Sequence, residues 1–145
     1  MRFEQTIVIN APADKVFAYV SDLTKLPEWG QFGNEVRQTS QGPVGVGSTF
    51  DTSGKQFGKH TDHVTVTEYV PGKKFTVEVT GDAGDVRNWF ELAEQGTGST
   101  NVTKGQEFTK PAMSARLSKP VIKRLAPKGL MKDLEKIKAR IEGTA

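Results

Sequence analysis

The chain opens with one strand-like segment and two short helical segments, and it then alternates with a period of two residues as far as Phe108. Residues 3–10 are rich in β-branched side chains and end in Asn-Ala-Pro, which is typical of an edge strand that stops before a helix. We expect Asn10 to cap this helix and Pro12 to lie in its first turn. The order predicts two short helices set against a long antiparallel sheet, an arrangement that can enclose a ligand.

Two helical segments follow the first strand. Val16, Phe17 and Val20 share one apolar face of the helix that starts at Ala13, so this face is expected to look inward. Residues 22–29 add one more helical turn before the sheet begins.

Turn signals rich in glycine divide the central part of the chain. Between them lie candidate strands at about 32–40, 47–55, 58–70, 73–81, 85–94 and 99–109. Their short connections imply antiparallel pairing, because a parallel return needs a longer crossover. With the first strand they predict a curved meander of about seven strands.

The last segment is helical again. One apolar stripe in it is formed by Leu130, Leu134, Ile137 and Ile141. The same spacing continues upstream through Met113, Leu117, Val121 and Leu125. Since Pro120 and Pro127 interrupt the hydrogen bonding of a helix, we expect one long, bent helix that lies across the sheet.

The size and composition fit one domain over residues 1–145. The absence of cysteine excludes disulfides, thiolate metal sites and cysteine nucleophiles. No segment approaches the roughly 20 apolar residues of a transmembrane helix, which leads us to expect a cytoplasmic protein. The positive charge is concentrated at the end, where residues 110–142 hold ten Lys and Arg against three Asp and Glu.

Several motifs, taken in order, resemble those of a known superfamily. They are the segment Asn-Ala-Pro-Ala-Asp-Lys-Val-Phe-Ala-Tyr-Val-Ser-Asp at 10–22, Leu-Pro-Glu-Trp at 26–29, Glu-Leu at 91–92 and a Gly-Thr-Gly-Ser-Thr-Asn-Val-Thr turn at 96–103. The chain thereby resembles the START-like (SRPBCC) superfamily, in its polyketide cyclase/dehydrase-like bacterial branch. The resemblance implies an α+β helix-grip fold, in which a curved antiparallel sheet wraps around a long C-terminal helix and leaves a cavity between them. It implies no single reaction, because members include lipid carriers, cyclases and dehydratases.

Aromatic and apolar residues at the expected meeting points of these elements are candidates for lining that cavity. They are Phe17, Trp29, Phe32, Phe50, Phe57, Val64, Val66, Trp89, Phe90, Phe108, Met113 and Leu117, with Gln106 as a polar contact. The competing interpretation is that they fill the core. Lys104 shares the face of Gln106, and we expect it near a rim.

Two pairs could carry acid–base chemistry. His60 and Asp62 lie on one face of their strand and could form a hydrogen-bonded pair. Arg87 and Glu91 share a face with Trp89, so they would enter the cavity only if Trp89 does, and the sequence leaves this parity open.

Other functions lack their signals. The two histidines, at i and i+3, point to opposite faces of a strand and predict no metal site, and we expect no cofactor. The glycine-rich segment 42–47 lacks the helix and lysine of a phosphate-binding loop, and no serine lies in a GxSxG turn. The basic tail lacks the interleaved aromatics of a nucleic-acid platform.

The sequence therefore favours a domain, monomeric or homodimeric, that binds an apolar or amphipathic small molecule such as a lipid, polyketide or aromatic metabolite. One alternative is a cyclase or dehydratase that uses His60 with Asp62, or Arg87 with Glu91. Another is an interaction module, whose basic C-terminal helix docks on an acidic protein or on the periphery of a membrane.

Overall fold

The computed structural model describes residues 1–30, 35–54, 60–81, 84–111 and 119–143. Its elements are, in order, β1 (Arg2–Ile9), α1 (Ala13–Val20), η1 (Leu23–Lys25), α2 (Leu26–Trp29), β2 (Glu35–Gln38), β3 (Thr49–Gly54), β4 (His60–Val70), β5 (Lys74–Gly81), β6 (Gly84–Gln95), β7 (Ser99–Pro111) and α3 (Lys119–Glu142). Two short helices after the first strand and a long C-terminal helix confirm the predicted order.

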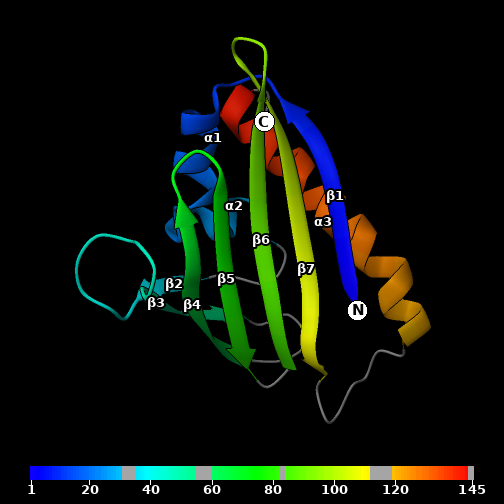
Figure 1. The fold of residues 1–145 in the computed structure, drawn as a ribbon. Coiled ribbons are helices and arrows are strands. Elements are labelled where there is room, and N and C mark those ends of the chain that lie inside the picture. Colours follow the sequence, from blue (N-terminus) through cyan, green and yellow to red (C-terminus); the bar gives the residue numbers. More distant parts are fainter. Residues whose placement is uncertain (31–34, 55–59, 82–83, 112–118, 144–145) are drawn as a thin grey trace.

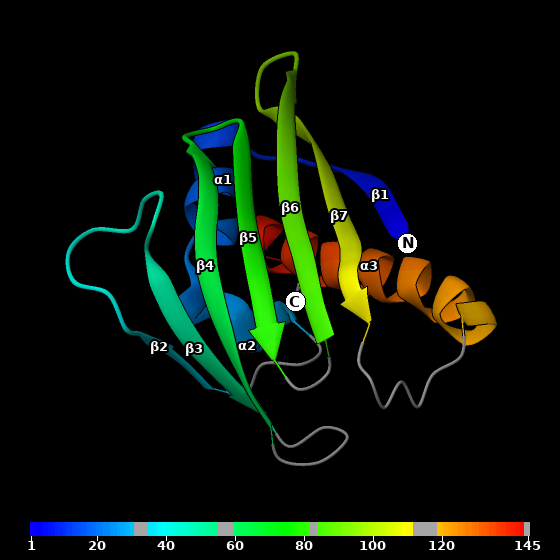
Figure 2. The same ribbon diagram turned by 60° about the horizontal axis from the view of Figure 1, so that its bottom comes forward.

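Seven strands form one antiparallel sheet in the order β1-β7-β6-β5-β4-β3-β2. The strands from β2 to β7 form a meander, and β1 joins its far edge beside β7 (Figure 1). The helices α1, α2 and α3 all lie on one side of this sheet (Figure 2), and we call the side that they cover the inner face. The helix-grip fold that the motifs implied is therefore confirmed.

The core fills the inner face beneath α1, α2 and the second half of α3. Register pairs Phe50 with Val64 and Phe75 with Phe90, and paired residues of adjacent strands point to the same face. All four side chains are buried in a single cluster with Val16, Phe17 and Val20 of α1 and Leu134 and Ile137 of α3. Removal of this apolar surface from water is the main force that holds the helices on the sheet.

The start of α1 differs from the prediction. Pro12 is the N-cap residue, its extended backbone precedes the helix, and its side chain makes no capping hydrogen bond. Asn10 is therefore two residues too far from the helix to cap it. The backbone N–H of Asn10 instead donates to the carboxylate of Glu142 at 2.8 Å. Its side-chain oxygen accepts a hydrogen bond from the hydroxyl of Ser99 at 3.3 Å.

Polar side chains tie α3 to the edge strand β1. Gln5 donates to the backbone carbonyl of Pro127 at 3.3 Å, and the ammonium of Lys138 donates to the carbonyl of Val8 at 2.7 Å. Lys138 also pairs with Glu142 at 2.7 Å. Together with the bond from Asn10 to Glu142, these contacts fix the helix from Pro127 to Glu142 along one edge of the sheet.

The first half of α3 extends past β1, away from the sheet (Figures 1 and 2). Val121 and Leu125 keep 38% and 51% of their surface exposed, so this upstream part of the apolar stripe is not buried in the core. They lie nine and five residues before Leu130, which at about 100° per residue places them on the side of α3 away from its buried stripe. Met113 and Leu117 lie outside the described residues. Among the helices that the structure describes, none combines the length and apolar character of a membrane span.

On the outer face of the sheet, one large aromatic side chain is buried against a glycine. Trp89 is 4% exposed, and it lies opposite Gly105 across β6 and β7. A Cβ atom at Gly105 would collide with the Trp89 indole ring. The missing side chain therefore makes room for the ring to lie flat on the sheet.

We predict that Gly105→Ala lowers the free energy of unfolding by about 1–3 kcal/mol, because the added methyl group overpacks against the indole of Trp89. Chemical denaturation measures the change. Gly45→Ala is the matched control, since nothing lies within 4 Å of a Cβ at that position. Equal stability of both variants would contradict this account of Trp89.

Candidate functional site

Register settles which side chains of β6 face the helices. Phe90 lies opposite Phe75 and Lys104 on the inner face, whereas Trp89 lies opposite Thr76 and Gly105 on the outer face. Arg87 and Glu91 have the parity of Trp89 and also point outward. Two of the four candidate acid–base residues therefore lie on the side of the sheet away from the helices.

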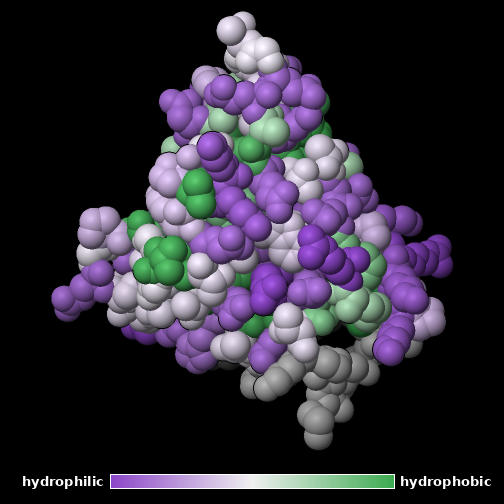
Figure 3. All heavy atoms as spheres, viewed as in Figure 1, coloured by the Kyte–Doolittle hydropathy of each residue, from purple (hydrophilic) through white to green (hydrophobic). Residues whose placement is uncertain are grey.

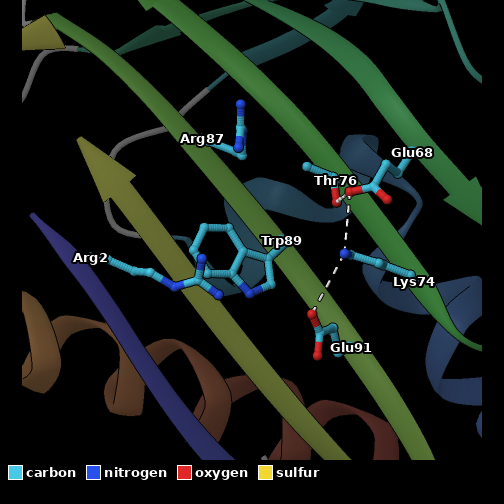
Figure 4. Close-up of a pocket in the computed structure, with 7 residues that line it drawn as sticks. All are labelled: Arg2, Glu68, Lys74, Thr76, Arg87, Trp89 and Glu91. Atoms are coloured by element: carbon cyan, nitrogen blue, oxygen red, sulfur yellow. Dashed lines mark hydrogen bonds and ion pairs between the residues drawn. The ribbon is translucent and has the colours of Figure 1, made fainter. Parts of the chain in front are cut away.

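A shallow pocket of about 80 Å³ surrounds Trp89 on this outer face (Figure 4). Arg2 stacks over the indole at 4.6 Å, and Lys74 lies between Glu68 at 3.3 Å and Glu91 at 3.6 Å. Thr76 and Arg87 complete the lining. These charges neutralise one another in exposed ion pairs, and the surrounding surface is largely hydrophilic (Figure 3). The pocket is thus too small and polar for the apolar ligand that the sequence favours.

Most of the described lining candidates belong to the packed core. Buried residues of this group are Phe17, Trp29, Phe50, Val64, Val66 and Phe90. Phe32, Phe57, Met113, Leu117 and the side chain of His60 lie outside what the structure describes. Asp62 is half-buried on the inner face, where its carboxylate occupies the position that a Cβ of Gly81 would need.

Below this core, part of the inner face is only half-buried. We call these residues the inner strip; they are Phe3, Val79, Val86, Asn88, Gln106 and Phe108. Phe3 and Phe108 contact each other edge to face, with ring centroids 6.3 Å apart. The strip is mostly apolar and carries two amides, a composition that suits the wall of a small-molecule site.

Where the inner strip meets the core, a charged pair is buried. Lys104 of β7 is 5% exposed and Asp133 of α3 is 8% exposed, with the ammonium nitrogen 3.7 Å from Oδ2 of the carboxylate. The expectation that Lys104 lies near a rim is wrong, because α3 covers the inner face at this position. Lys104 adjoins the inner strip, because it lies on the same face of β7 as Gln106 and two residues before it.

Aromatic rings surround the ammonium group of Lys104. Its nitrogen lies 5.7 Å from the ring centre of Trp29 and 5.6 Å from that of Phe90. The two rings contact each other edge to face at 5.6 Å. Cation–π attraction to these faces offsets part of the cost of removing the charge from water.

Burial moves both groups of the pair toward their neutral forms. It lowers the pKa of Lys104, and the nearby carboxylate of Asp133 opposes this only in part. It raises the pKa of Asp133 to about 6, although Lys104 and Lys136 act in the opposite direction. Titratable groups whose pKa values are perturbed by burial and by a charged partner are typical of functional sites.

Two buried polar atoms of this cluster lack a hydrogen-bond partner within the described part of the chain. They are the indole N–H of Trp29 and Oδ1 of Asp133, and the two residues are 4% and 8% exposed. An unsatisfied buried polar group typically costs about 1–3 kcal/mol, so such groups are rare without a partner. The cluster of Trp29, Phe90, Lys104 and Asp133, which we call the buried polar cluster, therefore has unused hydrogen-bonding capacity.

Sequence reasoning missed Asp133, although a signal was present. Asp133 lies three residues after Leu130 and four before Ile137, so it lies on the apolar stripe of α3. A carboxylate on a core stripe requires a partner, and Lys104 shares its strand face with Val102 and Gln106. In the described residues, no group of three His, Asp or Glu side chains could hold a metal ion.

Comparisons with known proteins agree with this architecture. A family model described as "Polyketide cyclase / dehydrase and lipid transport" matches residues 1–142. None of the curated proteins matches the chain.

Solved structures show the same fold at low sequence identity. A START superfamily protein from Mycobacterium smegmatis has a TM-score of 0.82 and 17% identity, with 99% of each chain covered. A protein from Chromobacterium violaceum has a TM-score of 0.73 and 19% identity, with 98% of each chain covered. The Zhui aromatase/cyclase from Streptomyces sp. R1128 has a TM-score of 0.72 and 15% identity, over 97% of this chain and 95% of that one.

We predict that Asp133 titrates near pH 6 in the folded protein and that its contribution to stability falls as the pH rises from 3.8 to about 6. The folded state holds the proton more tightly than the unfolded state, so this contribution is full below the ordinary pKa of 3.8 and lost above the folded value. NMR titration of the side-chain carboxyl carbon measures the midpoint directly. Asp133→Asn should remove the transition, and Lys104→Met should raise the midpoint because it removes the neighbouring positive charge. A midpoint near 3.8 would show that the carboxyl group is not desolvated.

Proposed function

Because the chain belongs to the polyketide cyclase/dehydrase and lipid transport family, we propose that it binds an apolar or amphipathic small molecule between the sheet and α3. The ligand lies along the inner strip, and one end of it reaches the buried polar cluster. Lipids, polyketides and aromatic metabolites are the classes with this shape and polarity. Ligand binding, and not a particular reaction, is the function that the site supports best.

The observation that carries this proposal is the unused hydrogen-bonding capacity of Trp29 and Asp133 in an apolar setting. A chain that folded only for stability would gain from apolar residues there, because a buried ion pair rarely repays its desolvation cost. The chain nevertheless places Lys104 and Asp133 at this position, where both charged groups are removed from water. The half-buried state of the inner strip supports the same conclusion, since these residues are neither solvated like a surface nor packed like the core.

We predict that a lipid or aromatic ligand raises the melting temperature of the purified protein. A ligand at about 100 times its Kd stabilises the fold by about 2.7 kcal/mol, which for a chain of this size corresponds to roughly 5–10 °C. Thermal-shift screening of lipids and aromatics, followed by native mass spectrometry, identifies the bound compound. Asn88→Trp should abolish the shift, because the new ring fills space along the inner strip, where the ligand would lie.

The neighbouring residue supplies the matched control for this screen. Arg87→Trp adds the same ring on the outer face, so it should leave the ligand-induced shift unchanged. A library that shifts neither the parent protein nor this control would contradict ligand binding. An unchanged shift in Asn88→Trp would place the ligand elsewhere.

A second candidate function is supported by the first part of α3, which extends past β1. Residues 119–132 of this helix carry five Lys and Arg and no Asp or Glu. At helical spacing, the exposed Val121 and Leu125 lie on the same side as Lys128 and Lys132. Apolar side chains flanked by cations are typical of helices that lie on anionic membrane surfaces. The second proposal is therefore that this face docks on an anionic lipid bilayer, where a ligand could be exchanged.

We predict that the protein sediments with vesicles of phosphatidylcholine and phosphatidylglycerol but not with phosphatidylcholine alone, and that binding weakens from about 0.05 M to about 0.15 M salt. Leu125→Glu should reduce vesicle affinity about tenfold, since it replaces an apolar contact with the bilayer by a negative charge that anionic lipids repel. Val70→Glu is the matched control, because Val70 is 45% exposed at the end of β4. Equal loss in both variants, or binding to a nucleic-acid duplex but not to vesicles, would contradict membrane docking.

A further inference from the structure

We infer that the buried polar cluster receives an uncharged group that both donates and accepts hydrogen bonds, such as the hydroxyl of a phenol, enol or alcohol. This inference rests on the proposed binding function and specifies which end of the ligand enters first. It also predicts what the site rejects: hydrocarbon ends without a polar atom, and ends that carry a full charge.

The charge balance of the cluster excludes charged ends. Lys104 and Asp133 face each other at 3.7 Å, and their opposite charges cancel in the ionised pair. A carboxylate that approached Lys104 would be repelled by Asp133, and an ammonium that approached Asp133 would be repelled by Lys104. Either ligand would add one uncompensated charge to a buried site, which is expensive in a poorly solvated environment.

The free atoms of the cluster define the polar end more closely. The indole N–H of Trp29 needs an acceptor, and Oδ1 of Asp133 needs a donor. The ammonium of Lys104 has three N–H donors, and the carboxylate oxygen of Asp133 lies 3.7 Å from it, beyond a short hydrogen bond. A hydroxyl group donates once and accepts twice, so its chemistry complements both an orphan donor and an orphan acceptor.

A bound water molecule has the same donor and acceptor capacity and is the competing occupant. The two occupants predict different relative affinities for a hydroxyl compound and its hydrocarbon isostere. If a water stays in the cluster, an isosteric hydrocarbon binds as well as the hydroxyl compound. If the ligand replaces it, the hydrocarbon leaves Trp29 and Asp133 without partners and binds more weakly.

Four probes with one aromatic body test the inference: 2-naphthol, 2-methylnaphthalene, 2-naphthoate and 2-(aminomethyl)naphthalene. Trp89→Phe leaves Trp29 as the single tryptophan of the two in the sequence, so fluorescence quenching then reports on the cluster itself. We expect 2-naphthol to bind about tenfold or more tightly than each of the other three, because it alone satisfies the free atoms without adding charge.

Paired substitutions locate the origin of the preference. Lys104→Met with Asp133→Leu should bring 2-naphthol and 2-methylnaphthalene to within about twofold of each other. The same exchange in the outer ion pair, Lys74→Met with Glu91→Leu, should keep the full preference. Should the inner double variant fail to fold, the ranking of probes on the parent protein still decides the matter.

The outcomes separate this inference from the binding function. Tightest binding by 2-naphthoate would make the cluster an anion receptor led by Lys104, and equal binding of all four probes would assign the free atoms to water. Either result overturns the inference and leaves ligand binding intact. Failure of every probe, together with silence in the lipid and aromatic screen, would instead remove the binding function.

Discussion

A lysine and an aspartate held in the layer between sheet and helix are the constraint around which this molecule is arranged. Their burial requires α3 to cross β7 at one place, because Asp133 has to lie within reach of Lys104. It also requires aromatic faces at that place, which Trp29 and Phe90 provide. The first part of the chain, the meander and the last helix thus each supply a part of one small site.

Strand register determines which residues can contribute to this site. A slip of one residue in β6 would turn Trp89 inward and Phe90 outward, and it would bring Arg87 and Glu91 into the core. Two features oppose such a slip. Gly105 accepts the indole of Trp89 on the outer face, and the outer ion pairs of Lys74 and Arg87 align with acidic partners on adjacent strands.

The fold could be predicted from the sequence because its signals are local. Turn residues and period-two alternation located the strands to within a few residues, and the short turns required antiparallel pairing. The site was harder, since Lys104 and Asp133 come from elements that meet only in the folded chain. The upstream residues of the stripe keep a spacing of four, but Leu125 lies nine residues before Leu134, about 180° around a continuous helix. The sequence left open whether the prolines break the helix, so it could not show that Leu125 is exposed while Leu134 is buried.

The ties between α3 and β1 explain why the helix can serve a ligand without sealing the sheet. Gln5 and Val8 lie on the edge strand β1, and Asn10 directly follows it. Their contacts hold the helix at Pro127, Lys138 and Glu142. Asp133 lies between the first and second of these ties, so its carboxylate is held in place from both sides.

The same ties leave the inner strip partly uncovered. They fasten the helix to β1 at one edge, while α1 and α2 pack over the core near Phe17 and Trp29. The half-buried residues of β6 and β7 therefore extend from the polar pair toward the end of β7 at Pro111. A ligand with an apolar body and one hydrogen-bonding end matches this change from polar pair to apolar strip. Its body loses water against apolar side chains, and its polar end exchanges hydrogen bonds with water for hydrogen bonds with the pair.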